Sequence, residues 1–563
     1  MPNYNHLQFL VLIADYILLV LLLAFVALKR GREIFSVLNP VDRFVIPVAV
    51  VVAFLLRWFL PEHTVAHVNG HGYRHIGMAI FPESDIHVYG SGYQALYHLL
   101  YKIFPPVTGV VIDANIVFGA LTVLFLGLLV ANIFPRGGGA AALALALTPV
   151  HVKLSATEDP SIPAMFFFIL ALWSACELRR RPNWDLALLC PLAAAPAAQM
   201  RAEFIFMPLI VLMFLLLCRR KVLTFLCGPL PFIVTAAMAI LLYGHFAWMK
   251  SIHLPPAGNS HYLSLLDLNP KHVLWGLSGK SLLWEHSCTP PLFLFCALVG
   301  VIAAFARRAA GAMLFALIFL GFTYLYGAAT AHYADLLRFS VPAQIFLAGL
   351  CGMGIGVISK FAAVRMRNKT AGLLVLALIP ATGIISYYPI KTLGAQEREY
   401  LLIQRAYQAL PARCTLVTPK RTMADGKVVA SFPIYEYDFK LRRSGRNSDT
   451  TQPPRAGPPN NDDECTTIWN SNWLEAGKFD PGGDQADQEC TIYFRGLACS
   501  SFTSEEASLK DSPLRPECKA FEERYRLEPV YVEKLETADL PTYYFRLPDP
   551  NFTMGFYKVF PAK

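Results

Sequence analysis

Long apolar runs recur through the N-terminal two thirds of the chain, and no other feature of the sequence constrains the fold as strongly. Each run has roughly 15 to 25 residues, which is the length an α-helix needs to cross a bilayer. The runs lie near residues 8–28, 43–60, 108–133, 138–153, 161–178, 184–200, 204–218, 223–243, 291–306, 311–328, 339–358 and 371–388. Only 16% of the 563 residues are charged, whereas soluble domains have about a quarter. The sequence therefore predicts an α-helical polytopic membrane protein with about twelve transmembrane helices.

The net charge of +9 reflects topology rather than a nucleic-acid partner. Basic residues gather in every second short loop, as the positive-inside rule requires. They are Lys29, Arg30 and Arg32; Arg136; Arg179, Arg180 and Arg181; Arg219, Arg220 and Lys221; Arg307 and Arg308; and Lys360, Arg365, Arg367 and Lys369. The same rule places the N-terminus outside, together with the loops around Asp159 and residues 244–290 and the C-terminal region. The first run is too long for a signal peptide and has no basic leader, so we expect it to be retained.

Residues 61–106 form the first loop predicted to lie outside, and they are polar and rich in histidine. The histidines are spaced four residues apart, at His63, His67, His71 and His75. Two His side chains at this spacing on a helix can bind one zinc ion, but Gly70 and Gly72 weaken such a helix. No cofactor is required by this pattern. A divalent metal is one interpretation, and a hydrogen-bonding His cluster is the one we favour.

The same loop ends in an amphipathic segment, residues 93–104, with apolar and aromatic residues at helical spacing. This pattern is typical of an interfacial helix on the membrane surface. For its last turn, an early start of the next span is an equal alternative.

A second polar cluster, residues 151–160, lies between two apolar runs that carry almost no charge. Its acidic pair is Glu158 and Asp159. A carboxylate pair is costly between apolar spans unless it is solvated or used, so we interpret it as a functional site. The alternative is an ordinary loop in which Asp159 and Pro160 cap the following helix. The two roles are compatible.

Two arginines lie at the predicted outer ends of spans. Arg201 can pair with Glu203 or face an anionic ligand. Arg338 can hold a phosphate through charge-assisted hydrogen bonds, or it can pair with Asp335.

Hydropathy falls from about Lys391, and residues 391–563 are predicted to form an outer α/β domain, following a membrane domain over residues 1–390. We expect a helix over residues 396–410 and strands near 414–418, 428–437, 490–494, 526–532, 543–547 and 554–559. Six of the twelve cysteines lie in segments predicted to be outside: Cys288, Cys414, Cys465, Cys490, Cys499 and Cys518. Disulfides are expected there, but the sequence does not select a pairing.

The segments together resemble the GT-C superfamily of integral-membrane glycosyltransferases, which use polyprenyl-phosphate sugars. The resemblance covers about residues 41–388 and is nearest to the bacterial branch with dolichyl-phosphate-mannose-type and aminoarabinose-type transferases. It depends on four local patterns in order: residues 89–97, Thr157-Glu158-Asp159, Met200-Arg201-Ala202-Glu203, and Arg338-Phe339 followed by Pro342.

The first loop departs from the family pattern, in which an acidic residue precedes a Tyr by a few positions. If Tyr73 sets the register, the chain has no carboxylate there. If Tyr89 sets it, Glu83 and Asp85 supply the acid. We favour the second register because it retains a carboxylate.

The resemblance implies that an acceptor hydroxyl attacks the sugar of a lipid phosphate with inversion, which needs a base and cations for the phosphate. Asp85 would be the base, with Asp159 sharing that role or orienting the acceptor; His67 or His71 would replace Asp85 in the other register. The implied catalytic residues are Asp159, Glu158, Asp85, Glu83, His67 and His71. The implied phosphate-binding residues are Arg338, Arg201 and Lys153.

The expected function is transfer of a sugar to a glycan, lipid or protein of the cell envelope, in a bacterial inner membrane with the C-terminal domain outside. Membrane lipid is an expected partner, and nucleic acid is not. A transporter or flippase for a lipid-linked or polar substrate is the main alternative, because it also has many spans with buried polar residues. A non-catalytic membrane scaffold is a third.

Overall fold

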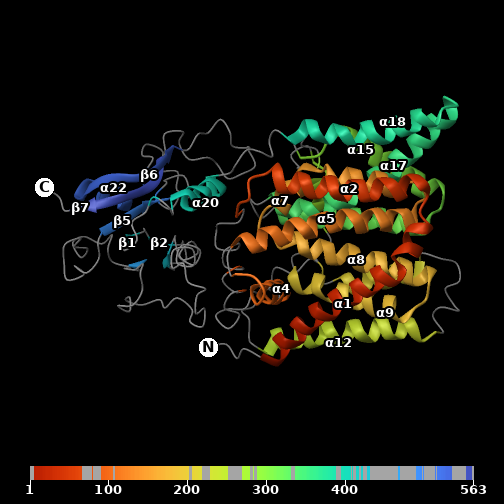
Figure 1. Cartoon of the computed structure of the whole chain (residues 1–563), viewed down its shortest axis with the longest axis horizontal. Helices are drawn as coiled ribbons and strands as arrows, with labels where there is room; N and C mark the ends of the chain where they lie inside the picture. The colour runs from red at the N-terminus through yellow and green to blue at the C-terminus, as the bar shows by residue number, and fades with distance from the viewer. Residues whose placement is uncertain are drawn as a thin grey trace. The chain divides into compact units, whose positions relative to one another are not determined.

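The structure is a computed structural model (Figure 1). It describes residues 6–65, 76, 79, 91–105, 108–201, 204, 206–217, 228–251, 269–278, 283, 288–330, 336–387, 395–406, 409, 414–417, 420–422, 428–430, 467–468, 490–496, 499, 514, 516–534 and 553–560. The chain divides into two compact units. We call them the membrane unit (Met1–His63, Asp85–Lys102 and Val111–Lys391) and the C-terminal unit (Thr64–Ser84, Ile103–Val110 and Thr392–Lys563).

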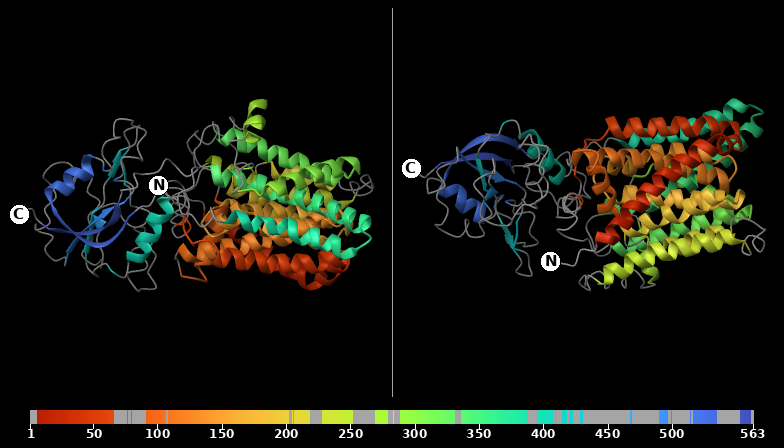
Figure 2. Two further views of the ribbon diagram at one scale, coloured as in Figure 1. Left: turned by 90° about the horizontal axis from the view of Figure 1, so that it is seen from above. Right: turned by 60° about the horizontal axis from the view of Figure 1, so that its bottom comes forward.

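The membrane unit is a bundle of helices that run alongside one another (Figures 1 and 2). Its helices are α1 (His6–Ser36), α2 (Pro40–Phe59), α4 (Gly92–Tyr101), α5 (Thr108–Ile133), α6 (Gly138–Ala146), α7 (Pro149–Ser155), α8 (Ser161–Arg180), α9 (Trp184–Met200), α10 (Met207–Leu217), α12 (Pro229–Ser251), α14 (Pro270–Gly276), α15 (Pro291–Ala306), α16 (Ala310–Thr330), α17 (Leu336–Arg365) and α18 (Lys369–Ala381), followed by the 3-10 helix η2 (Thr382–Tyr387). Every apolar run of the sequence lies at least in part on one of these helices.

Five of the described helices are long and apolar enough to cross a membrane, or six if the bent pair α6–α7 is one span. The expectation of about twelve spans remains a prediction, because several other apolar helices are shorter. Large apolar side chains on the rim are exposed, including Leu28 of α1 (90%), Phe44 of α2 (72%) and Ile240 of α12 (73%). Such a surface suits lipid rather than water, and the protein is an integral membrane protein.

The run predicted over residues 138–153 is broken into α6 and α7, which meet at an angle of 61°. Leu147 is the C-cap of α6, and Thr148 has an extended backbone (φ −74°, ψ 114°). Pro149 follows at the first turn of α7, where its missing N–H is tolerated, and it disfavours a helical conformation at Thr148. We call residues 147–148 the helix break.

At the centre of the bundle, the apolar part of α8 is buried along its whole length. It packs against α9, α10 and α17. Aromatic rings fill this interior: Phe168 of α8 lies 5.4 Å from Phe204 and 5.8 Å from Phe346 of α17, measured between ring centroids. The first residue of this buried helix, Ser161, directly follows the acidic pair and Pro160.

The C-terminal unit contains a five-stranded sheet of order β4-β1-β5-β7-β6 and a separate hairpin, β2–β3. The strands are β1 (Cys414–Val417), β2 (Lys420–Thr422), β3 (Val428–Ala430), β4 (Thr467–Ile468), β5 (Cys490–Arg495), β6 (Arg526–Lys534) and β7 (Thr553–Phe560), with helices α20 (Ala395–Ala406) and α22 (Pro516–Arg524). β4, β1 and β5 are parallel, whereas β5, β7 and β6 are antiparallel. The predicted strand over residues 543–547 lies outside the described residues, and β2, β4 and α22 were not anticipated.

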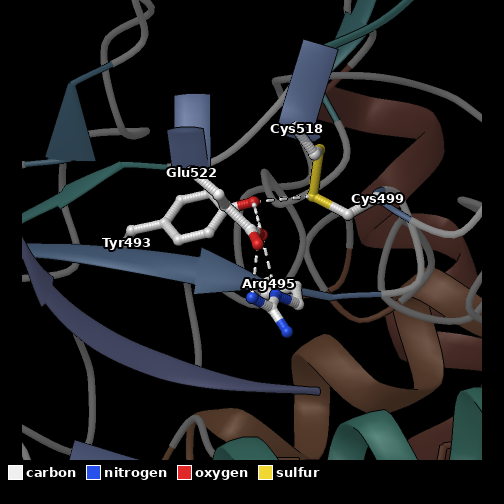
Figure 3. Close-up of a disulfide and its surroundings, with 5 residues drawn as sticks. All are labelled: Tyr493, Arg495, Cys499, Cys518 and Glu522. Atoms are coloured by element: carbon white, nitrogen blue, oxygen red, sulfur yellow. Dashed lines mark hydrogen bonds and ion pairs between the residues drawn. A yellow bond between two sulfur atoms is a disulfide. The ribbon is translucent and has the colours of Figure 1, made fainter. Parts of the chain in front are cut away.

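A disulfide, Cys499–Cys518, joins the end of β5 to α22 (Figure 3). Beside it, the Tyr493 hydroxyl donates a hydrogen bond to Glu522 over 3.2 Å, and Arg495 Nε donates to the same carboxylate over 2.7 Å. Burial raises the pKa of the Tyr493 phenol well above its usual value, and the Glu522 carboxylate raises it further. Tyr493 therefore stays a neutral donor, and the cluster fixes α22 against the sheet.

Replacing Cys499 and Cys518 together by Ser should lower the free energy of opening of this unit by about 3 kcal/mol, the entropic stabilisation expected for a loop of this size. The two cysteines are 19 residues apart. Hydrogen exchange of the β5 amides in the full chain measures the loss. In wild type, a reductant should accelerate this exchange because it breaks the disulfide. In the double variant, which lacks this disulfide, the reductant should not accelerate it. Free thiols at both positions in non-reducing peptide maps of wild type would contradict the pairing.

Candidate functional site

The acidic pair lies in the turn between α7 and α8, which we call the acid loop (residues 157–160). Glu158 and Asp159 are both buried, each with 0% exposure. Asp159 Oδ1 accepts a hydrogen bond from Ser161 N over 2.7 Å, and Asp159 N donates to Thr157 Oγ1 over 3.3 Å. Pro160 is the N-cap of α8, and the Asp159 carboxylate binds the N–H of the first helical residue, so both residues of the capping interpretation lie at the start of this helix.

Side chains from α4 and α5 hold the backbone of the acid loop. Asn115 Nδ2 donates to the carbonyls of Thr157 (2.7 Å) and Asp159 (3.2 Å). Tyr93 donates its hydroxyl hydrogen to the carbonyl of Glu158 over 2.7 Å. Tyr97 in turn donates to Asn115 Oδ1. Three successive carbonyls are satisfied in this way, which stabilises one conformation of a buried polar loop.

The two tyrosines of α4 are neutral donors. Burial raises the pKa of Tyr93 and Tyr97 well above the usual value, and nearby tyrosines and the Asp159 carboxylate raise both further. A neutral phenol can donate a hydrogen bond next to carboxylates without adding charge.

The helix α4 differs from the expected surface helix over residues 93–104. Residues 92–97 are buried, and only the second half reaches the surface. The helix ends at Tyr101, and residues 102–105 are not helical, so its last turn is not the beginning of the next span. Of its aromatic residues, Tyr93 contacts the acid loop and Tyr97 reaches it through Asn115, whereas Phe104 is 51% exposed.

The predicted phosphate-binding residues lie on neighbouring elements. Lys153 is on α7 with 5% exposure, and Arg201 is the C-cap of α9 with 6% exposure. The Arg201 guanidinium carbon lies 5.5 Å from the ring centre of Phe339, which follows Arg338 in α17. Arg338 is in the first turn of α17, and only its backbone is described. α17 packs against both α7 and α8, the two helices that flank the acid loop.

The other candidates fall in the first loop. Asp85, Glu83, His67 and His71 lie outside the described residues, as do Glu203 and Asp335. His63 is described, and its Nε2 lies 3.1 Å from the carbonyl oxygen of Trp58. Among the described residues, no group of three His, Cys, Asp or Glu side chains is placed to hold a metal ion. The first-loop assignments therefore stay predictions.

The sequence interpretation missed Asn115, although a signal for it exists. Asn115 is a polar residue with 0% exposure in the otherwise apolar helix α5. A polar side chain inside a span requires partners and by default marks a site. The roles of Tyr93 and Tyr97 had no such signal, because aromatic residues near a membrane have many ordinary uses.

Part of the chain matches a known family. Residues 92–248 match the model of the PMT_2 family, described as dolichyl-phosphate-mannose-protein mannosyltransferase. The matched stretch runs from α4 into α12 and contains Asn115, the acid loop and Arg201. No curated protein matches the chain.

A solved structure is also similar: the crystal structure of the Archaeoglobus fulgidus oligosaccharyltransferase in complex with Zn and sulfate. The identity is 14% and the TM-score 0.43, over 66% of this chain and 60% of that one. The chain thus spans less than two thirds of that structure's length. The family match over residues 92–248, which is less than half of the chain, and the apolar helices around it support a membrane glycosyltransferase.

Proposed function

We propose that the protein transfers a sugar from a polyprenyl-phosphate donor to an acceptor hydroxyl on the extracytoplasmic side of a bacterial inner membrane. The observation that supports this most is the acid loop itself. Two carboxylates are buried at the start of the central helix of an apolar bundle, inside the stretch that matches the mannosyltransferase family model. In the proposed orientation, the C-terminal domain lies outside, where it can meet a glycan, lipid or protein acceptor of the cell envelope.

The proposed reaction is a direct displacement at the anomeric carbon. The acceptor oxygen forms a bond to that carbon as the bond to the phosphate oxygen breaks, and the electron pair leaves with the polyprenyl phosphate. One displacement inverts the anomeric configuration. The hydroxyl proton passes to a carboxylate, for which we propose Asp159, with Glu158 orienting the acceptor. Asp85 or Glu83 of the first loop would share the role, or His67 or His71 in the other register.

The leaving phosphate needs positive charge. Arg201, Lys153 and Arg338 are the proposed ligands, because an arginine fork can bind two phosphate oxygens at once and a lysine adds a point charge. Arg201 is only 6% exposed, and its stacking on Phe339 holds the guanidinium plane. A cation in such a dry environment stabilises developing negative charge more than one in water.

The burial of the acid loop has a consequence for the chemistry. Because Glu158 and Asp159 have 0% exposure, an acceptor must displace covering side chains before it reaches them. The same burial keeps water from the carboxylates when no acceptor is present. This protects an activated donor from hydrolysis.

The test is release of polyprenyl phosphate from a donor labelled in its lipid, using purified protein in detergent and an envelope extract as acceptor. We expect release that depends on protein and acceptor and moves the sugar to the acceptor fraction. A transporter, a flippase or a scaffold would leave the donor intact. The absence of release across lipid-phosphate donors with hexosyl and pentosyl groups would refute the proposal.

Asn115→Leu should lower the rate of transfer by about 100-fold, since small displacements of a reacting group cost that much. The substitution removes the two hydrogen bonds that Asn115 donates to the acid loop, and it removes the oxygen that accepts the hydrogen bond from Tyr97. Initial rates at saturating donor measure the effect. Asn132→Leu is the matched control, because Asn132 lies at the other end of the same helix and binds Glu177 and Arg180. An Asn115→Leu protein that is folded and fully active would contradict a role for this contact.

A further inference from the structure

Arg57 is a fully buried cation, with 0% exposure, near the end of α2. Its five N–H donors meet five neutral acceptors. Nε donates to Ser155 Oγ (3.3 Å), Nη1 to the carbonyls of Ala53 (2.9 Å) and Ala146 (3.3 Å), and Nη2 to the carbonyl of Leu145 (3.3 Å) and to His151 Nδ1 (2.6 Å). A guanidinium has five donors in a rigid fork, so this set uses all of them.

Four of these acceptors lie on the two sides of the helix break, and the fifth, the carbonyl of Ala53, belongs to α2 itself. Leu145 and Ala146 are the last two residues of α6, at the end where the helix dipole is negative. His151 and Ser155 lie on α7, which ends at the acid loop. One guanidinium therefore joins α2, the end of α6 and the whole length of α7.

The histidine in this set has a defined tautomer. A guanidinium can only donate, so Nδ1 of His151 accepts and its proton is on Nε2. His151 is 0% exposed, and Nε2 has no hydrogen-bond partner among the described residues. Among the described residues, the bond to Arg57 is thus the one hydrogen bond of the imidazole ring, and that contact holds the ring in place.

The helix α5 connects the guanidinium to the acid loop. Gly119 of α5 has no side chain, and a Cβ there would lie 2.4 Å from Ser155 Oγ and 3.0 Å from Arg57 Nε. One turn earlier on the same helix, Asn115 binds the carbonyls of Thr157 and Asp159. Four residues of an α-helix rise about 6 Å. The contact of α5 with Arg57 and its contact with the acid loop are therefore on successive turns of this helix.

We propose that Arg57, through His151, is a positioning residue that fixes the angle of the helix break and thereby the location of the Asp159 carboxylate. This inference depends on the proposed function only for its kinetic consequence. Arg57 does not bind the donor phosphate, because its donors are used by protein acceptors. Loss of the contact therefore acts on kcat, whereas donor binding by Arg201, Lys153 and Arg338 is unaffected.

The test compares His151→Asn with His151→Leu. Asn offers an amide oxygen where Nδ1 stood, and Leu offers no acceptor. We expect His151→Leu to lower kcat about tenfold or more without changing KM for the donor, and His151→Asn to restore most of the loss. Arg57→Lys keeps the charge but has only three donors, so it should resemble His151→Leu. Arg43→Met in the same helix is the control: Arg43 also donates to backbone carbonyls, but it is exposed and lies at the other end of α2.

Hydrogen exchange in the same proteins separates positioning from general destabilisation. In His151→Leu, we expect faster exchange confined to residues 147–160, with unchanged exchange in α16 and α17. Wild-type kcat in folded His151→Leu, equal losses in the Asn and Leu variants, or a rise in exchange over the whole bundle would each overturn the proposal. If wild type releases no polyprenyl phosphate, the proposed function fails, and the exchange pattern still decides whether Arg57 and His151 position the acid loop.

Discussion

Asp159→Asn is expected to reduce the release of polyprenyl phosphate by a factor of about 10²–10⁴, the usual contribution of a general base. The substitution changes little else. Asn keeps an oxygen that can accept the hydrogen bond from Ser161 N, so this contact at the start of α8 survives. Its volume is nearly that of Asp, and the contacts of Asn115 to this loop are to backbone carbonyls, which the substitution leaves in place. The substitution removes the negative charge of the side chain and with it the ability to accept a proton.

Two further variants make this result specific. Glu158→Gln should cost less than Asp159→Asn if Glu158 orients the acceptor and does not take the proton. Asp42→Asn is the matched control, because Asp42 is another buried carboxylate of the membrane unit and accepts a hydrogen bond from Gly139 N over 2.7 Å. It joins α2 to α6 and should not alter the rate of the chemical step. Full transfer by a folded Asp159→Asn protein would remove Asp159 from the mechanism.

The helices were predictable because hydropathy is a local property. The run at residues 108–133 coincides with α5, and the run at 184–200 coincides with α9. A single Pro in an apolar run was a weaker signal. Pro149 breaks the predicted run at residues 138–153 into two helices, whereas α9 contains Pro191 and Pro196 without a break. A proline in an apolar run therefore does not by itself decide whether the helix continues. At Pro149, the last carbonyls of α6 are bound by Arg57, which is remote in the sequence.

The candidate site was predictable only in part, for the same reason. Glu158 and Asp159 stood out because two adjacent carboxylates between apolar runs are costly without a use. Arg57 did not stand out, because one arginine near the end of an apolar run normally extends its side chain to the interface. Its acceptors Leu145, His151 and Ser155 are 88 to 98 residues away in the sequence. A contact between such distant residues leaves no local pattern.

In the C-terminal unit, the sequence predicted β5, β6 and β7 but not their order. The sheet places β7, the last strand of the chain, between β5 and β6. The six cysteines predicted to lie outside can be joined in fifteen different sets of three disulfides, and the sequence did not select one. Cys499 and Cys518 are paired because β5 and α22 pack together, and that packing is set by Tyr493, Arg495 and Glu522.

Arg57→Met should lower the free energy of unfolding of the membrane unit by about 3 kcal/mol, at the upper end of the cost of leaving a buried polar group without its hydrogen-bond partner. Methionine fills the space of the side-chain stem but donates no hydrogen bonds. Ser155, His151 and the carbonyl of Ala146 would then be polar groups inside an apolar bundle without the donor they now use. The broken helix α6–α7 would lose the group that joins its two halves. Denaturation of the purified protein by SDS, followed by circular dichroism, measures the difference from wild type.

Arg43→Met isolates the effect of burial in this comparison. Arg43 belongs to the same helix as Arg57 and donates to three backbone carbonyls, those of Phe35, Ser36 and Leu38. It is exposed, so water can replace the guanidinium at each carbonyl, and we expect a loss of about 1 kcal/mol or less. The two substitutions remove the same chemical group from the same helix and differ in access to water. Equal losses in the two variants would mean that burial of Arg57 adds nothing, and that the helix break is held by Thr148 and Pro149 alone.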